Sequence, residues 1–109
     1  MRAIAFFVLL ITALICHTQE VLVGYGLGVQ GCGKYIEERR TPNHNYDALI
    51  TSWFYGFASG HNFYSSTSQI KQEVDSETVL AYLDKQCRDY PLSSISVGAD
   101  KLIKTYRKE

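Results

Sequence analysis

The sequence predicts a small all-α domain, a bundle of about four helices with one disulfide, after an N-terminal signal peptide. Two observations carry this prediction. Apolar residues recur at helical spacing after residue 43 and again after residue 75, and polar or proline-containing stretches separate these segments. At 109 residues, 46% of them apolar, the chain has room for one domain.

The first 18 residues have the composition of a secretory signal peptide. Fourteen of them are apolar, and the apolar core of thirteen residues, 3–15, is shorter than a membrane span of about 20 residues. We expect cleavage before Gln19, which leaves residues 19–109 as a single helical domain with no integral membrane span, periplasmic or secreted. A buried N-terminal helix is an alternative, although such a helix would have no polar face to expose to solvent. Lipid anchoring through Cys16 is less favoured, because Ile15 stands where a lipobox has a small residue.

Removal of the signal peptide would leave two cysteines, Cys32 and Cys87. An even number of cysteines in an exported chain favours a disulfide. A Cys32–Cys87 bond closes a loop of 56 residues (87 − 32 + 1), which the chain-entropy model translates into about 4 kcal/mol of stabilisation. Two buried free thiols are the alternative.

Helix-breaking residues divide the first half of the domain. Residues 19–31 hold four glycines, which disfavour a helix, so we expect a short strand or an irregular arm. A short helix over residues 33–40 is ended by Thr41 and Pro42. The clearest helix follows residues 43–45. Its apolar side chains at i, i+3, i+4, i+7, i+8 and i+11 are Tyr46, Leu49, Ile50, Trp53, Phe54 and Phe57.

The second half predicts a loop and two further helices. Residues 63–74 are expected to connect the elements, and Asp75 is suited to cap the next helix. Pro91 is expected in the first turn of the last helix. The apolar stripes of these two helices comprise Val79, Leu80, Leu83, Cys87 and Tyr90, and then Leu92, Ile95, Ala99, Leu102, Ile103 and Tyr106.

Small residues recur every four positions beside the apolar face of the longest helix. They are Ser52, Gly56 and Gly60. Each glycine costs a helix about 1 kcal/mol, which suggests a compensating packing role. We therefore expect another helix to approach this stripe closely.

No motif in the sequence predicts catalysis, a metal or a cofactor. Gly26, Gly28 and Gly31 have the spacing of a dinucleotide-binding fingerprint, but that motif requires a strand–turn–helix unit that the helical pattern does not offer. His44 and His61 are too few for a zinc site. The formal net charge of zero argues against a nucleic-acid partner. We expect a protein that is not an enzyme.

Ring-bearing side chains crowd the end of the longest predicted helix. Seven of them fall within residues 53–64, more than a domain of this size can bury. Exposed aromatic patches mark protein-binding surfaces. The candidate partner surface consists of Tyr55, His61, Asn62, Phe63 and Tyr64, together with the adjoining loop.

Four short segments resemble the Rap/Tai group of small exported immunity proteins. They are Cys32-Gly33-Lys34-Tyr35-Ile36-Glu37, Trp53-Phe54-Tyr55-Gly56-Phe57-Ala58-Ser59-Gly60, Val79-Leu80-Ala81-Tyr82-Leu83 and Ala99-Asp100-Lys101-Leu102-Ile103. The placement of Cys87 before Arg88-Asp89-Tyr90-Pro91 is similar to HdeA, a helical periplasmic acid-stress chaperone with a single disulfide. The resemblance covers residues 30–106.

The resemblance implies an exported helical binding protein of immunity type, which sterically neutralises an effector that attacks the cell wall. An HdeA-like acid-stress chaperone is the alternative, and a structural envelope protein without a catalytic role is a further one. The partner in the first two cases is another protein, an effector or a client, and a homodimer is also considered.

Overall fold

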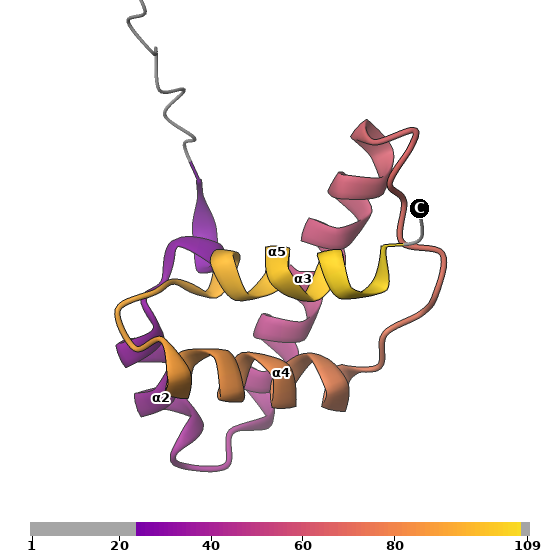
Figure 1. The fold of residues 1–109 in the computed structure, drawn as a ribbon. Coiled ribbons are helices and arrows are strands. Elements are labelled where there is room, and N and C mark those ends of the chain that lie inside the picture. The colour runs from indigo at the N-terminus through magenta and orange to yellow at the C-terminus, as the bar shows by residue number, and fades with distance from the viewer. Residues whose placement is uncertain (1–23, 108–109) are drawn as a thin grey trace, which may run out of the picture.

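Residues 24–107 are described by the structure, a computed structural model (Figure 1). They form a 3-10 helix, η1 (Gly26–Val29), and four α-helices: α2 (Cys32–Arg39), α3 (His44–Tyr64), α4 (Ser76–Asp89) and α5 (Ile95–Tyr106). Only two isolated bridges, and no strand, occur in this range. The all-α prediction is therefore confirmed, whereas the predicted signal peptide, residues 1–18, lies outside the described residues.

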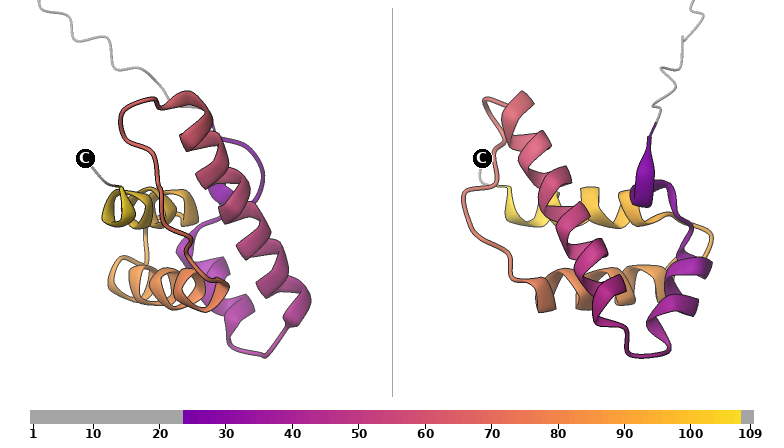
Figure 2. Two further views of the ribbon diagram at one scale, coloured as in Figure 1. Left: turned by 90° about the vertical axis from the view of Figure 1, so that its right-hand side faces the viewer. Right: turned by 180° about the vertical axis from the view of Figure 1, so that it is seen from behind.

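The helices α4 and α5 lie side by side, and α3 crosses them obliquely (Figure 2). The core fills the space between α3 and this pair, and α2 closes one end. Its largest fully buried side chains are Tyr35, Ile50, Phe54, Val79, Leu83, Ile95, Leu102 and Ile103. Because these positions recur at helical spacing, each helix turns one continuous apolar face inward.

The predicted disulfide is present. Cys32 at the start of α2 is bonded to Cys87 in α4, and both residues are fully buried. The bond ties the first α-helix of the domain to the third, as the sequence predicts.

Polar side chains cap two of the helices, and Asp75 is the one that the sequence predicts. The Asn43 side chain accepts a hydrogen bond from the Tyr46 amide at 3.2 Å, and Asp75 accepts one from the Thr78 amide at 2.8 Å. Each bond satisfies an amide that has no partner within its helix. The end of α3 differs from the prediction, because the helix continues to Tyr64 before the loop begins.

The start of α5 was predicted wrongly. Pro91 lies in a turn and not in the helix, which begins at Ile95 after Ser94. A hydrogen bond from the Ser93 amide to the Tyr90 carbonyl at 3.0 Å closes this turn, and the Ile95 amide then donates to the Gln30 carbonyl at 3.0 Å. Leu92 is therefore fully exposed and does not join the apolar stripe.

Two further stripe positions are also exposed, Leu49 and Tyr90. Leu49 lies on the part of α3 that faces away from α4 and α5. The Tyr90 ring is covered on one face by the Lys101 ammonium, 4.3 Å from the ring centroid. A cation over an aromatic face is favourable at the surface, which explains an exposed tyrosine at the end of α4.

The described part of the glycine-rich arm forms η1 and not a strand. Gly28 lies directly against the Trp53 indole, where a Cβ atom would overlap the ring. Only glycine permits this approach of the arm to α3.

The small-residue stripe of α3 is not covered by another helix. Within residues 24–107, no atom other than those of α3 itself lies within 4 Å of a Cβ placed on Gly56 or Gly60. The expectation of helix packing on this stripe is wrong for this part of the chain. The physical reason is that α4 and α5 pack on the opposite face, which carries Ile50 and Phe54.

Candidate protein-binding site at the end of α3

The C-terminal half of α3 extends beyond the helices that it crosses (Figures 1 and 2). Residues 65–75, here called the strap, turn at its end and run back to the start of α4. The strap contains no helix and only one isolated bridge, between Ile70 and Arg107. Something other than regular secondary structure must therefore hold it against α3.

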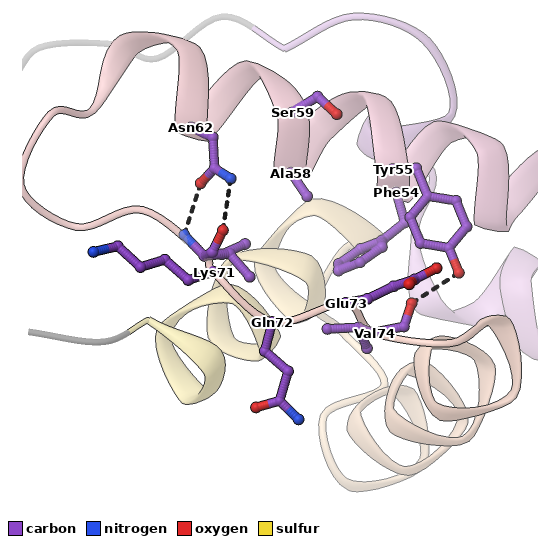
Figure 3. Close-up of a pocket in the computed structure, with 10 residues that line it drawn as sticks. Phe54, Tyr55, Ala58, Ser59, Asn62, Lys71, Gln72, Glu73 and Val74 are labelled. Atoms are coloured by element: carbon purple, nitrogen blue, oxygen red, sulfur yellow. Dashed lines mark hydrogen bonds between the residues drawn. The ribbon is translucent and has the colours of Figure 1, made fainter.

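Side chains of α3 hold the strap through its main chain. Asn62 donates to the Ile70 carbonyl at 2.8 Å and accepts from the Ile70 amide at 2.7 Å (Figure 3). The Tyr55 hydroxyl donates to the Val74 carbonyl at 2.8 Å. These three bonds satisfy strap groups that no strand partner reaches.

A further contact lies closer to the turn. The Nε2 atom of His61 is 2.9 Å from the Ser68 carbonyl oxygen. The Ser65 and Ser68 hydroxyls are 2.6 Å apart, and the Ser68 amide also donates to the Ser65 hydroxyl. The turn that follows α3 is thus fixed by its own polar side chains.

A cavity of about 250 Å³ lies between α3 and the strap (Figure 3). Phe54, Ala58 and Val74 give it an apolar wall, whereas Lys71 and Glu73 lie on the exposed part of the strap.

Two aromatic side chains stand free at the end of α3. Phe63 is 85% exposed and Tyr64 is 89% exposed, and their rings meet edge to face with centroids 5.5 Å apart. We call this pair the tip. Of the five residues predicted to form a partner surface, these two are the most open to solvent. Tyr55 is 37% exposed and binds the strap through its hydroxyl, and His61 and Asn62 also bind the strap.

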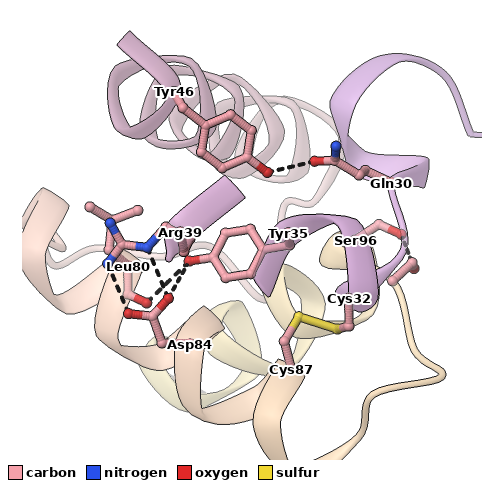
Figure 4. The surroundings of a disulfide bond; sticks show 10 residues. Gln30, Cys32, Tyr35, Arg39, Tyr46, Leu80, Asp84, Cys87 and Ser96 are labelled. Atoms are coloured by element: carbon pink, nitrogen blue, oxygen red, sulfur yellow. Dashed lines mark hydrogen bonds and ion pairs between the residues drawn. A yellow bond between two sulfur atoms is a disulfide. The ribbon is translucent and has the colours of Figure 1, made fainter. Parts of the chain in front are cut away.

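A polar cluster links α2, α3 and α4 at the other end of the bundle (Figure 4). Arg39 donates to both carboxylate oxygens of Asp84, at 3.0 and 2.8 Å, and to Asp47 at 2.7 Å. The Tyr35 hydroxyl donates to Asp84 at 2.8 Å. One arginine thereby holds two carboxylates from two different helices.

This cluster shifts the titration of its members. Burial, followed by the hydrogen bond to Asp84, raises the pKa of Tyr35. Burial alone would raise the pKa of Asp84, but the hydrogen bonds from Arg39 and Tyr35 outweigh it and hold that pKa below its ordinary value. Asp84 is therefore ionised at neutral pH. No pattern in the sequence singled out this carboxylate, because its partners Tyr35 and Arg39 lie 49 and 45 positions away.

Within residues 24–107, no three His, Cys, Asp or Glu side chains are grouped so that they could hold a metal ion. None of the helices in this range is long and apolar enough to cross a membrane.

No protein-family model, curated protein or solved structure matches the chain. The resemblance to the Rap/Tai group and to HdeA therefore stays a prediction from the short segments that carry it.

Proposed function

We propose that this protein is an exported binding protein of immunity type, which inserts the tip and the adjoining turn into the cleft of a cell-wall-targeting effector. The observation that carries the proposal is the exposure of Phe63 and Tyr64 at the end of a projecting helix. Aromatic side chains of this kind supply much of the binding energy in protein interfaces.

The part of α3 next to the tip is bonded to the strap. Four contacts between α3 and the strap, made by Tyr55, His61 and Asn62, fix the segment next to the tip. A surface that is already fixed loses little conformational entropy when a partner binds. Steric occlusion of an enzyme cleft needs such a rigid projection.

The rest of α3 has the composition of an interface. Asp47 is the single Asp, Glu, Lys or Arg in its 21 residues, although its outer face is exposed at Leu49, Gly56 and Phe63. Depletion of charge distinguishes the centres of protein interfaces from other surfaces. We infer that the outer face of α3 continues the contact made by the tip.

A cell-wall hydrolase encoded beside this protein would support the proposal, and inhibition of that hydrolase tests it. We expect wild-type protein to block hydrolysis of peptidoglycan by that enzyme. The Phe63→Ala/Tyr64→Ala variant should inhibit at least about 30-fold less well, the equivalent of one hot-spot contact of about 2 kcal/mol. Leu92→Ala is the matched control, because Leu92 is equally exposed but lies at the other end of the molecule.

Two outcomes would refute the proposal. One is a wild-type protein that neither binds nor inhibits the neighbouring hydrolase. The other is a tip variant that inhibits as well as the wild type. Since both tip rings are exposed, their removal should leave the melting temperature unchanged, so that lost inhibition cannot be attributed to unfolding.

A second candidate function is the HdeA-like chaperone, and the Arg39 cluster favours it. Protonation of Asp47 and Asp84 would remove the charges that join three helices through Arg39. At about pH 2–3, a chaperone of this type should then expose apolar surface and suppress the aggregation of its clients. Fluorescent-dye binding and light scattering of a client protein measure these two effects, and the absence of both would exclude the function.

A further inference from the structure

We propose that a pocket between α2 and α4 is a second binding site, which takes a carboxylate group between the guanidinium groups of Arg40 and Arg88. This pocket, called here the basic pocket, has a volume of about 240 Å³. Its lining consists of Ile36, Arg39, Arg40, Asp84 and Arg88. The site is separate from the tip, and the proposal does not depend on the proposed function.

The charges of the pocket do not cancel. Three arginines and one aspartate line it. Arg39 is neutralised, because it is paired with Asp84 and with Asp47 from α3. Arg40 and Arg88 have no ion pair with any residue in the range 24–107. The four charged residues of the lining carry a net charge of +2, and Asp47, the second partner of Arg39, reduces the local charge to +1.

The nearby carboxylates have other partners. Glu37 and Glu38 are paired with Lys34, and Asp89 is paired with Lys85. Asp84 already accepts hydrogen bonds on both oxygens, from Arg39 and Tyr35. The charge of Arg88 helps to lower the pKa values of Asp84 and Asp89, but neither carboxylate forms an ion pair with it within residues 24–107. The guanidinium groups of Arg40 and Arg88 therefore remain available to an anion from outside the described chain.

The donors of Arg39 extend the site. A guanidinium carries five N–H groups, and three of those of Arg39 donate hydrogen bonds to Asp84 and Asp47. Two remain for a ligand in the pocket that this side chain lines. Arg39 cannot turn away to follow a ligand, because both carboxylates hold it in place.

The covalent bond beside the pocket keeps its walls together. Arg88 directly follows Cys87, which is bonded to Cys32 at the start of α2 (Figure 4). On α2, the residues Ile36, Arg39 and Arg40 share one face at i, i+3 and i+4. The spacing of the two helices in this region is therefore set before any ligand binds, which lowers the entropic cost of binding.

The shape and chemistry of the lining favour a carboxylate attached to a short carbon chain. The planar fork of an arginine matches the two oxygens of a carboxylate. The half-buried Ile36 side chain offers apolar contact to the carbon atoms that carry the group. An acidic side chain of a peptide has both features, and so does a small organic acid.

The test is a titration of the oxidised protein followed by ¹⁵N–¹H spectra of its arginine side chains at constant ionic strength. The probes are the α-amide of N-acetyl-glutamate, the neutral α-amide of N-acetyl-glutamine, and inorganic phosphate. We expect saturable shifts of the Arg40 and Arg88 Nε–H signals with the glutamate derivative and none with the glutamine derivative. Arg88→Gln should weaken binding about fivefold, the equivalent of one exposed charge contact.

Lys71→Gln provides the matched control, since Lys71 is also a cation without an ion pair within residues 24–107 but lines the other cavity. This change should leave the affinity unaltered. Equal losses in the Arg88 and Lys71 variants would overturn the proposal, because they would indicate only a general charge effect. Equal shifts with the neutral probe, or shifts with phosphate alone, would overturn the assignment of a carboxylate. A peptide containing one glutamate that binds more tightly than the free derivative would identify a peptide as the source of the group.

Discussion

Replacing Asn62 with alanine is expected to release the strap from α3 while the bundle stays folded. The Asn62 side chain both donates to and accepts from the main chain of Ile70, at 2.8 and 2.7 Å. The Asn62→Ala variant leaves the amide and the carbonyl of Ile70 without these partners. The contact between His61 and Ser68 and the bond between Tyr55 and Val74 remain, so the strap should open in the middle and stay attached at its ends.

The size of this effect follows from the two bonds that are lost. Each net hydrogen bond contributes about 0.5–1.5 kcal/mol. Because Ile70 is only half-buried, water can replace part of the lost bonding. We expect a loss of about 1–2 kcal/mol, which corresponds to a 5- to 30-fold higher population of the open strap.

Hydrogen exchange measures this local opening. The Ile70 amide should exchange about 5 to 30 times faster in Asn62→Ala, whereas core amides such as that of Leu83 should keep their protection. Asn45→Ala is the matched control, because Asn45 lies exposed in the first turn of the same helix, where no hydrogen bond of its side chain is found among residues 24–107. An unchanged rate at Ile70 would refute this account of the strap. So would an equal rise at Leu83, since it would show that the whole domain had opened.

Four further changes test the fold. Gly56→Ala should raise the free energy of unfolding in urea by about 0.5–1 kcal/mol, because the added methyl group meets open space in a helix. Gly28→Ala should lower the free energy of unfolding by about 1–3 kcal/mol, because the added methyl group overlaps the Trp53 indole. Reduction of the disulfide should lower it by about 2–4 kcal/mol, and a reduced protein that melts at the same temperature as the oxidised one would contradict this. The pKa of Asp84 is lower in the folded protein than in the unfolded chain, and this difference stabilises the folded protein at any pH above the ordinary pKa of an aspartate. The stabilisation is lost as the pH falls through the pKa that Asp84 has in the folded protein. Arg39→Met should therefore weaken the dependence of stability on pH below the ordinary pKa of an aspartate, about 4, and an identical pH profile in both proteins would argue against a role for this pair.

The helices could be predicted from the sequence because their signals are local. The caps Asn43 and Asp75 and the spacing of Ile50 and Phe54 lie within a few residues of the structure they determine. The start of the last helix was predicted wrongly because Pro91 is also a local signal. A proline suits the first turn of a helix, but Pro91 lies in a hydrogen-bonded turn, and bonds between residues 93–95 and a segment some 60 positions earlier in the chain fix the helix start at Ile95.

The candidate site could be predicted only in part. Tyr55 and Asn62 fall outside the main apolar stripe of α3, which made exposure the simplest expectation. The strap has no periodicity that could place it against them, and its bonds to Val74 and Ile70 reach across 19 and 8 positions. A polar side chain beside a long irregular segment can thus form hydrogen bonds with the main chain of that segment, where the sequence alone suggests contact with a partner protein.

The two proposed functions differ in where acid should act. The Arg39 cluster depends on the carboxylates Asp47 and Asp84, so acid weakens the joint between α2, α3 and α4. The strap is held by Asn62, by the Tyr55 hydroxyl and by the ring of His61, and no carboxylate takes part in these bonds.

The end of α3 can therefore keep its shape under conditions that loosen the other end of the bundle. A chaperone needs the loosening, because its clients bind apolar surface that becomes exposed. An inhibitor of a cleft needs only the rigid tip. If the tip remains ordered and inhibits at a pH at which the Arg39 cluster has opened, the binding function does not require the acid response. If the tip becomes disordered at the same pH at which the Arg39 cluster opens, the two ends of the bundle form one cooperative unit. Both proposed functions then depend on the response of the protein to acid.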